Sequence, residues 1–135
     1  MQQIQFAPTT PDIKLITLIN NAGLLGEMTS ISNIDNEKIV ATYHVNVITP
    51  HILMNTFLQT YQHLEVKKCI INVSSGAAKT PYAGWSIYCA TKSAIDMMSL
   101  VAAEEQSLLP ERTATRIIAL APGVMDTNMQ QQIRN

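Results

Sequence analysis

Three short apolar runs, each followed at once by small polar residues, constrain the fold of this chain more than any other feature. They cover residues 14–19, 68–73 and 116–120. Each run has the length and β-branched content of a buried strand, and each ends at turn-forming residues. Two long helix-like segments, from about Ser32 to Gln62 and from about Ser86 to Leu109, separate the runs. Strands that alternate with helices predict right-handed βαβ crossovers and a parallel sheet.

The limits of the first helical segment are set by residues with known positional preferences. Ser32 or Asp35 can cap its start, because both side chains accept hydrogen bonds from backbone amides at a helix N-terminus. Pro50 has no N–H, so we expect it to kink or divide the helix. Ile4-Gln5-Phe6 is a further, weaker strand candidate. The sequence therefore predicts three principal strands and two long helices, the first of them interrupted.

Polar turns follow all three predicted strands directly. They are Asn20–Gly23, Ser74–Gly76 and Pro122–Thr127. In a parallel sheet the carboxyl ends of the strands share one edge, and ligands bind there. Tyr88 and Lys92 lie four residues apart on the second helix and therefore share a face. We expect the turns and these two side chains to converge on one site.

Tyr88, Lys92 and Ser75 form a combination suited to the reduction of a carbonyl group. An ammonium close to a phenol favours the phenolate, so the phenol can pass its proton to a carbonyl oxygen. Such general acid catalysis is typically worth about 10²–10⁴-fold. Ser75 can donate a hydrogen bond to the same oxygen. The spacing Tyr-x-x-x-Lys is weak evidence alone, since it also fits a surface pair; the order of all the elements favours a catalytic role.

The amino-acid composition argues against several classes of function. The chain is 47% hydrophobic and 14% charged with a net charge of −1, which is typical of a globular domain and argues against nucleic acid or an anionic membrane as partner. We find no apolar run of about 18 residues and no signal peptide. Cys69 and Cys89 have neither metal-ligand spacing nor a disulfide pattern. We therefore expect a cytoplasmic protein without a metal site.

In their order and spacing, these residues resemble the short-chain dehydrogenase/reductase family. The resemblance covers roughly residues 15–129, and the stretch Gly84–Cys89 with Ala103–Gln106 is most similar to the family's sepiapterin reductase and bacterial benzil reductase branch. The matching groups are Asn20-Asn21-Ala22-Gly23, Asn46, Ser75, Tyr88-Cys89-Ala90-Thr91-Lys92 and Pro122-Gly123-Val124-Met125-Asp126-Thr127.

The resemblance implies a role for each residue. Tyr88 would be the general acid, Lys92 would favour its phenolate and bind the nicotinamide ribose, and Ser75 would orient the substrate carbonyl. Asn46 would hold a water in a proton relay to Lys92. The first turn would lie beside the adenosine and the last beside the nicotinamide. The implied cofactor-binding residues are Asn20, Asn21, Ala22, Gly23, Tyr88, Lys92, Pro122, Gly123, Val124 and Thr127.

By the same resemblance, the chain would be an NADP-dependent carbonyl reductase, with NAD left open as the cofactor. Its substrate would be a small-molecule ketone, and it would form a homodimer through the two long helices. The alternative is a catalytically inactive fragment, or an interaction protein whose helices associate with another copy or with a full-length relative.

One part of the family pattern is not found in this sequence. The five glycines do not form the Thr-Gly-x-x-x-Gly-x-Gly turn that lets backbone amides approach a pyrophosphate. We therefore expect residues 1–135 to form a single partial domain. Its fold would be α/β, a Rossmann-like parallel sheet in a three-layer α/β/α arrangement, without the N-terminal phosphate-binding βα unit. Its first strand would then have an unpaired apolar edge, which predicts marginal stability.

Overall fold

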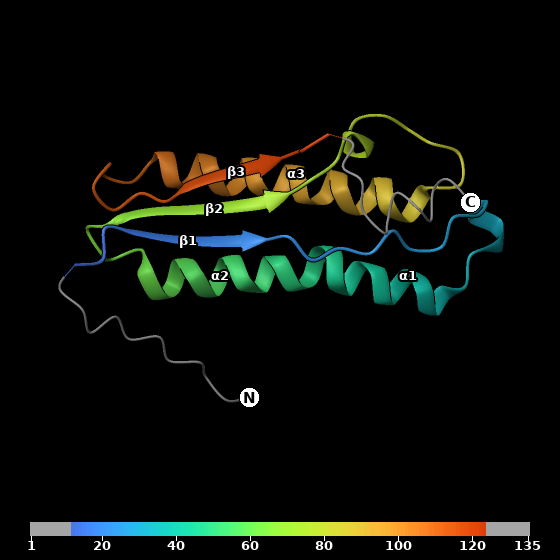
Figure 1. Cartoon of the computed structure of the whole chain (residues 1–135), viewed down its shortest axis with the longest axis horizontal. Coiled ribbons are helices and arrows are strands. Elements are labelled where there is room, and N and C mark those ends of the chain that lie inside the picture. The colour runs from blue at the N-terminus through green and yellow to red at the C-terminus, as the bar shows by residue number, and fades with distance from the viewer. Residues whose placement is uncertain (1–11, 124–135) are drawn as a thin grey trace.

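A three-stranded parallel sheet forms the centre of the computed structural model, which describes residues 12–123 (Figure 1). Its strands are β1 (Leu15–Asn20), β2 (Lys67–Val73) and β3 (Arg116–Leu120), in the spatial order β1-β2-β3. The three predicted strands are confirmed to within one residue at each end. The candidate strand at residues 4–6 lies outside the described residues.

The register of the sheet aligns the polar strand ends. Asn20 is paired with Asn72, and Val73 with Leu120. Beyond the last pair, the Ser74 N–H donates to the Leu120 carbonyl at 2.8 Å. The turns that follow β1 and β2 and the start of the turn after β3 therefore meet at the carboxyl edge, as the sequence predicts.

The first helical segment begins four residues later than predicted. A 3-10 turn, η1 (Ile31–Asn33), comes first, and α1 (Asn36–Tyr43) follows. Ile34 and Asp35 between them have extended backbone, so the helix cannot start before them. Of the two candidate caps, Asp35 is the one used, since its carboxylate accepts the Glu37 N–H at 2.9 Å.

A π-helical turn, η2 (His44–Ile48), joins α1 to α2 (Thr49–Tyr61). The Thr49 N–H bonds to the His44 carbonyl five residues back, and the Thr49 hydroxyl donates to the same oxygen at 2.9 Å. Pro50 follows at the start of α2 and has no N–H for the carbonyl of Asn46. The predicted interruption at Pro50 thus takes the form of one widened turn directly before it.

The second long helix, α3 (Ser86–Ser107), begins where predicted and ends two residues earlier. The Leu109 N–H bonds to the Gln106 carbonyl and so closes the helix before Pro110. The segment before α3 is a turn in which Gly84 has φ +82°, a left-handed conformation that favours glycine.

Both long helices cover the same face of the sheet (Figure 1). The core cluster shows this directly, because it joins the helices and strands through Met54 and Phe57 of α2, Ala102 of α3, Ile70 of β2 and Ile117 of β3. Each strand follows its neighbour in one direction across the sheet, so two right-handed crossovers must pass on the same side. Residues 12–123 therefore form two layers and do not supply the third layer of the predicted α/β/α arrangement.

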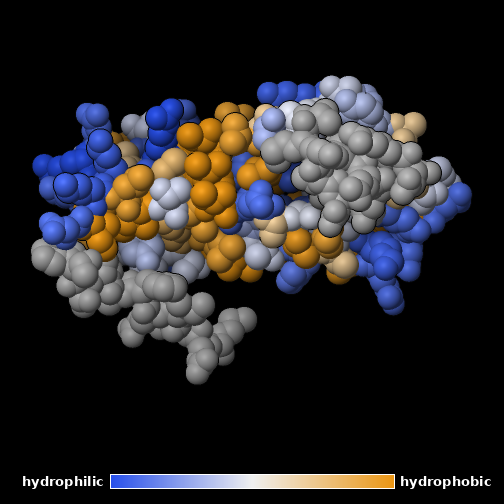
Figure 2. Space-filling model, viewed as in Figure 1, coloured by the Kyte–Doolittle hydropathy of each residue, from blue (hydrophilic) through white to orange (hydrophobic). Residues whose placement is uncertain are grey.

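The opposite face of the sheet carries apolar side chains that the described residues leave open. Ile19 of β1 is 59% exposed, and Leu15 and Leu120 on the same face are also exposed. Figure 2 shows hydrophobic residues gathered over the strands in this view. β1 and β3 are the two edges of the described sheet. An open apolar face and two unpaired edges support the expectation of marginal stability.

A fully buried amide, Asn72, connects the sheet to both helices. Its oxygen accepts from Asn20 Nδ2 at 2.7 Å, and its Nδ2 donates to Ser99 Oγ at 2.8 Å. The Met54 sulfur lies 3.1 Å from the same nitrogen. One side chain of β2 thus bonds to β1, α3 and α2, and each of its polar atoms has a partner.

We expect the substitution Asn72→Leu to destabilise the chain by about 1–3 kcal/mol, because the buried amide of Asn20 loses its acceptor. Urea unfolding followed by circular dichroism measures this change. The matched control Asn55→Leu lies on the exposed side of α2 and should change the unfolding free energy by less than about 0.5 kcal/mol. Equal effects of the two substitutions would show that the buried amide has no special part in stability.

Candidate active site

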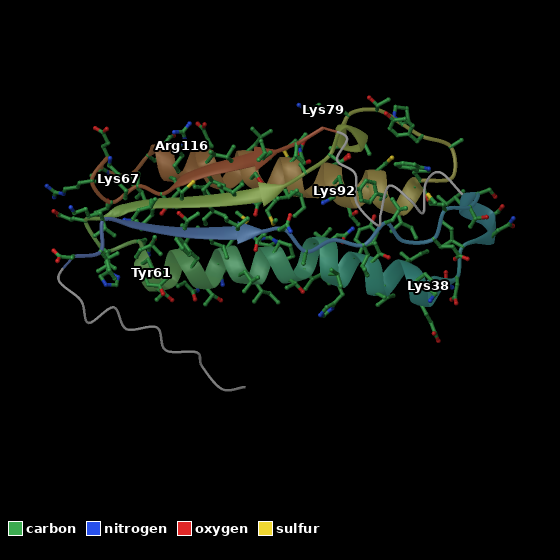
Figure 3. All side chains as sticks on the ribbon, viewed as in Figure 1. Lys38, Tyr61, Lys67, Lys79, Lys92 and Arg116 are labelled. Atoms are coloured by element: carbon green, nitrogen blue, oxygen red, sulfur yellow. The ribbon has the colours of Figure 1, made fainter. Side chains whose placement is uncertain are left out.

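Helix α3 carries Tyr88 and Lys92 on neighbouring turns. Figure 3 shows Lys92 beside the carboxyl end of β2. The Lys92 Nζ lies 5.6 Å from the centroid of the Tyr88 ring. It also donates to the Val73 carbonyl, the last of β2, at 2.7 Å. The predicted shared face is confirmed, and the lysine joins the helix to the strand end.

Burial sets the electrostatics of this pair. Lys92 is 6% exposed and Tyr88 8%. The loss of hydration lowers the pKa of Lys92 from its ordinary value of 10.5, while the negative charge of Asp96 acts in the opposite direction. An ammonium has three N–H donors, and the Val73 carbonyl uses one of them. The remaining donors can serve hydroxyl groups of a bound molecule.

Asn46 lies in η2 and connects the turn after β1 to the helices. Its Oδ1 accepts the Leu24 N–H at 2.8 Å, and its Nδ2 donates to the Leu24 carbonyl at 2.8 Å. A Cβ atom added to Gly23 would lie 3.7 Å from Asn46 Oδ1 and 3.5 Å from Lys92 Nζ. Gly23, Asn46 and Lys92, which are distant in sequence, therefore meet at one place as predicted.

Ser75 directly follows Ser74 at the end of β2 and is half-buried. Its Oγ accepts the Ala77 N–H at 3.2 Å and so caps the short turn η3 (Gly76–Ala78). Ala77 in turn packs against Tyr88, which places the serine and the tyrosine around one small cluster. No hydrogen bond between Ser75 and Tyr88 is present among the described residues.

The predicted cofactor-binding residues differ in where their side chains lie. The side chain of Asn20 is buried and bonds to Asn72, so it belongs to the sheet, whereas Asn21 and Ala22 are exposed at the carboxyl edge. Pro122 and Gly123 follow β3 and are exposed as well. Val124 and Thr127 lie outside the described residues.

Two residues near the site, Thr91 and Ser74, were not among the predicted site residues. Thr91 is completely buried beneath Tyr88, and Ser74 has a buried hydroxyl without a partner in the described part of the chain. Trp85 stands edge-on to the Tyr88 ring at 6.0 Å between centroids. The sequence did contain a signal for Thr91. The buried face of α3 includes positions 88, 91, 95 and 99, so Thr91 is a polar residue on the inward face of the helix.

An aromatic row leads from the surface toward the tyrosine. The exposed ring of Tyr82 lies 5.2 Å from the ring of Trp85, centroid to centroid, and Trp85 is followed by Tyr88. Trp85 also packs against the buried cluster of Leu25, Ala77 and Tyr88. These contacts are those of a packed side chain.

These groups are suited to proton transfer. A phenol, a buried ammonium and a hydroxyl can together protonate and polarise a carbonyl oxygen. Among residues 12–123, no cluster of His, Cys, Asp and Glu is arranged to hold a metal ion. No helix in the same range is long and apolar enough to cross a membrane.

Comparison with known proteins identifies similar chains. Benzil reductase ((S)-benzoin forming) of Bacillus cereus is 42% identical over 123 residues, which are 91% of this chain and 49% of the relative. Sepiapterin reductase of Rattus norvegicus is 33% identical in an alignment of 137 positions that covers 99% of this chain and 50% of the relative. The chain thus spans about half the length of the curated relatives it matches.

A solved structure and a family profile lead to the same assignment. A short-chain dehydrogenase/reductase of Burkholderia vietnamiensis superposes with a TM-score of 0.70 and 35% identity, over 90% of this chain and 55% of that one. The sequence profile described as "short chain dehydrogenase" matches residues 11–135. The chain therefore belongs to the short-chain dehydrogenase/reductase family.

Proposed function

We propose that this chain carries the catalytic part of an NADP-dependent carbonyl reductase, with Tyr88 as the general acid. The observation that carries the proposal is the buried pair of Tyr88 and Lys92, with the Lys92 Nζ 5.6 Å from the centre of the phenol ring. The positive charge stabilises the phenolate that remains when Tyr88 gives its proton to a carbonyl oxygen. The hydroxyl of Ser75 donates to the same oxygen.

The residues around Lys92 fit a nicotinamide nucleotide. Val73 takes one ammonium donor, and the others are suited to the hydroxyl groups of a ribose. The turns Asn21–Gly23 and Pro122–Gly123, which are exposed except for the half-buried Gly23, border the same edge. When bound, the reduced cofactor supplies the hydride that the protein itself lacks. NADP rather than NAD rests on the similarity to the benzil and sepiapterin reductases.

Asn46 is suited to hold a water that returns a proton to Tyr88 through Lys92. Pro50 cannot donate to the Asn46 carbonyl, so this backbone acceptor has no α-helical partner. Asn46 Oδ1 also faces the site across Gly23 from Lys92 Nζ. Both acceptors are positioned by η2, and π-helical turns are frequent at functional sites.

The substrate that fits best is an aromatic ketone. Tyr82 and Trp85 present rings beside Tyr88, and offset or edge-on packing of an aryl group on such rings is favourable. The names of the relatives agree, since benzil and sepiapterin are both aromatic carbonyl compounds. Trp85 would then both pack against the cluster and border the substrate.

We expect the purified chain to oxidise NADPH in the presence of benzil, and Tyr88→Phe to lower kcat by about 10²–10⁴-fold because the proton donor is lost. Absorbance at the nicotinamide band measures turnover. The control Tyr61→Phe removes a hydroxyl at the C-terminal end of α2, far from Lys92 in Figure 3, and should leave kcat within about twofold. Equal turnover by Tyr88→Phe and the unaltered chain would refute the role of Tyr88.

The single tryptophan makes cofactor binding measurable without turnover. Trp85 is the one Trp of the chain, and NADPH bound beside Tyr88 should quench its fluorescence. We expect Lys92→Met to weaken NADPH binding by about 10–100-fold, because hydrogen bonds from an ammonium to the ribose are lost. Lys79→Met, at an exposed position, is the matched control. Titrations with NADPH and NADH test the cofactor preference, and equal affinities would contradict NADP dependence.

A specific observation also favours association through the helices, either as part of the reductase or as the function of an inactive chain. The outer sides of α2 and α3 carry exposed large apolar side chains, namely Ile52, Leu53, Met97, Leu100 and Val101. Monomeric proteins seldom leave such apolar patches open. We propose that a second copy of the chain covers them and forms a homodimer.

We expect light scattering to give the mass of a dimer and Leu100→Glu to give a monomer, because Leu100 is 64% exposed on α3 and a charge there opposes burial. His63→Glu, in the exposed loop after α2, is the control and should remain dimeric. A monomeric mass for the unaltered chain at high concentration would remove the interaction hypothesis and leave the enzymatic one.

A further inference from the structure

Thr91 joins the two helical turns that carry the candidate catalytic groups. Its side chain is fully buried on α3. The hydroxyl donates to the Tyr88 carbonyl at 3.0 Å and accepts from Asn46 Nδ2 at 3.1 Å. A hydroxyl has one proton, and a carbonyl can only accept, so the Thr91 oxygen must be the acceptor toward Asn46. The direction of both hydrogen bonds is thereby fixed.

The amide of Asn46 is consequently held from two sides. Leu24 bonds to both ends of it, with its N–H to Oδ1 and its carbonyl to Nδ2. Thr91 takes the second proton of Nδ2 from the side of α3. Both donors of the amide are therefore used, and Oδ1 is the amide atom that lies against Gly23.

Gly23 lies beside both this oxygen and the ammonium of Lys92. An added Cβ would be 3.7 Å from Asn46 Oδ1 and 3.5 Å from Lys92 Nζ, which are ordinary van der Waals distances. The glycine has no left-handed backbone, so alanine is allowed there. A methyl group at Gly23 would therefore contact both polar atoms.

We propose that Thr91 is a positioning residue, whose hydroxyl holds the Asn46 amide beside Gly23 and Lys92 by tying Asn46 to the Tyr88 turn. Among the described residues, the Thr91 hydroxyl forms the side-chain hydrogen bond that connects η2 to α3. Without it, Asn46 would remain fixed to Leu24 alone, and its distance to Lys92 would depend on helix packing. The effect on turnover rests on the proposed function; the effect on Asn46 does not.

A hydroxyl role and a packing role predict opposite results for two conservative substitutions. Thr91→Val keeps the shape of the side chain and removes the hydroxyl, whereas Thr91→Ser keeps the hydroxyl and removes a methyl group. If Thr91 acts through its hydroxyl, serine rescues the defect that valine causes. If it acts by packing, valine is neutral and serine is the more harmful change.

The first measurement is NMR of the Asn46 side-chain amide protons in the full chain without cofactor. We expect Thr91→Val to raise their hydrogen exchange rate by about tenfold, since one buried hydrogen bond is lost, and Thr91→Ser to leave it within about threefold. Unchanged exchange in Thr91→Val, or equal exchange in both variants, would overturn the proposal. If Thr91→Val does not fold, Thr91→Ala replaces it in the same comparison with Thr91→Ser.

The second measurement is steady-state turnover with NADPH and benzil. We expect Thr91→Val to lower kcat by about tenfold with less than a threefold change in the NADPH KM, and Thr91→Ser to restore kcat. Gly23→Ala should lower kcat similarly while leaving the exchange of the Asn46 amide unchanged, because its methyl group fills the space beside an intact amide. A normal kcat in Thr91→Val would overturn the positioning role. Absence of turnover in the unaltered chain would count against the proposed function alone, and the amide exchange would then decide the role of Thr91.

Discussion

The buried amide of Asn72 is the interaction on which the arrangement of the site depends. It accepts from Asn20 across the sheet and donates to Ser99 on α3. Parallel strands can slip in register by two residues without exchanging their faces, but a slip here would leave these buried amides unpaired. The amide therefore fixes where β1 and β2 end relative to each other, and it fixes α3 against them. Tyr88 and Lys92 lie on that helix, and Ser75 follows the end of β2.

A second set of polar side chains also fixes helical elements to the carboxyl edge of the sheet. Lys92 reaches from α3 to the last carbonyl of β2, and Asn46 reaches from η2 to both backbone groups of Leu24. Every one of these links joins a helix to a strand end through a buried polar side chain with a defined partner. Apolar packing alone permits small shifts of a helix along the sheet, whereas directional hydrogen bonds do not. The precision of the site comes from these links more than from the hydrophobic core.

The sequence predicts the strands, the start of α3 and the pairing of Tyr88 with Lys92, because these depend on local patterns with a strong physical cause. It does not predict that both helices lie on one face. That outcome depends on the strand order β1-β2-β3, and no local pattern determines which strands become neighbours. Thr91 was missed for a related reason, since its importance comes from Asn46, a residue on another helix. The residues of the site could thus be named from sequence, but the contacts that position them could not.

The π-helical turn relates one backbone irregularity to the position of Asn46 in the site. Pro50 cannot complete an α-helical bond to Asn46, and the chain responds by widening the turn from His44 to Ile48. A regular helix would satisfy the Asn46 carbonyl within itself. The widened turn leaves that acceptor without an α-helical partner at the same residue whose side chain holds Leu24 and Thr91. The position of Pro50, four residues after Asn46, therefore connects an irregularity of the helix backbone to the polar side chain beside Lys92. A substitution at Pro50 would change the position of Asn46 although Pro50 itself makes no contact with the site.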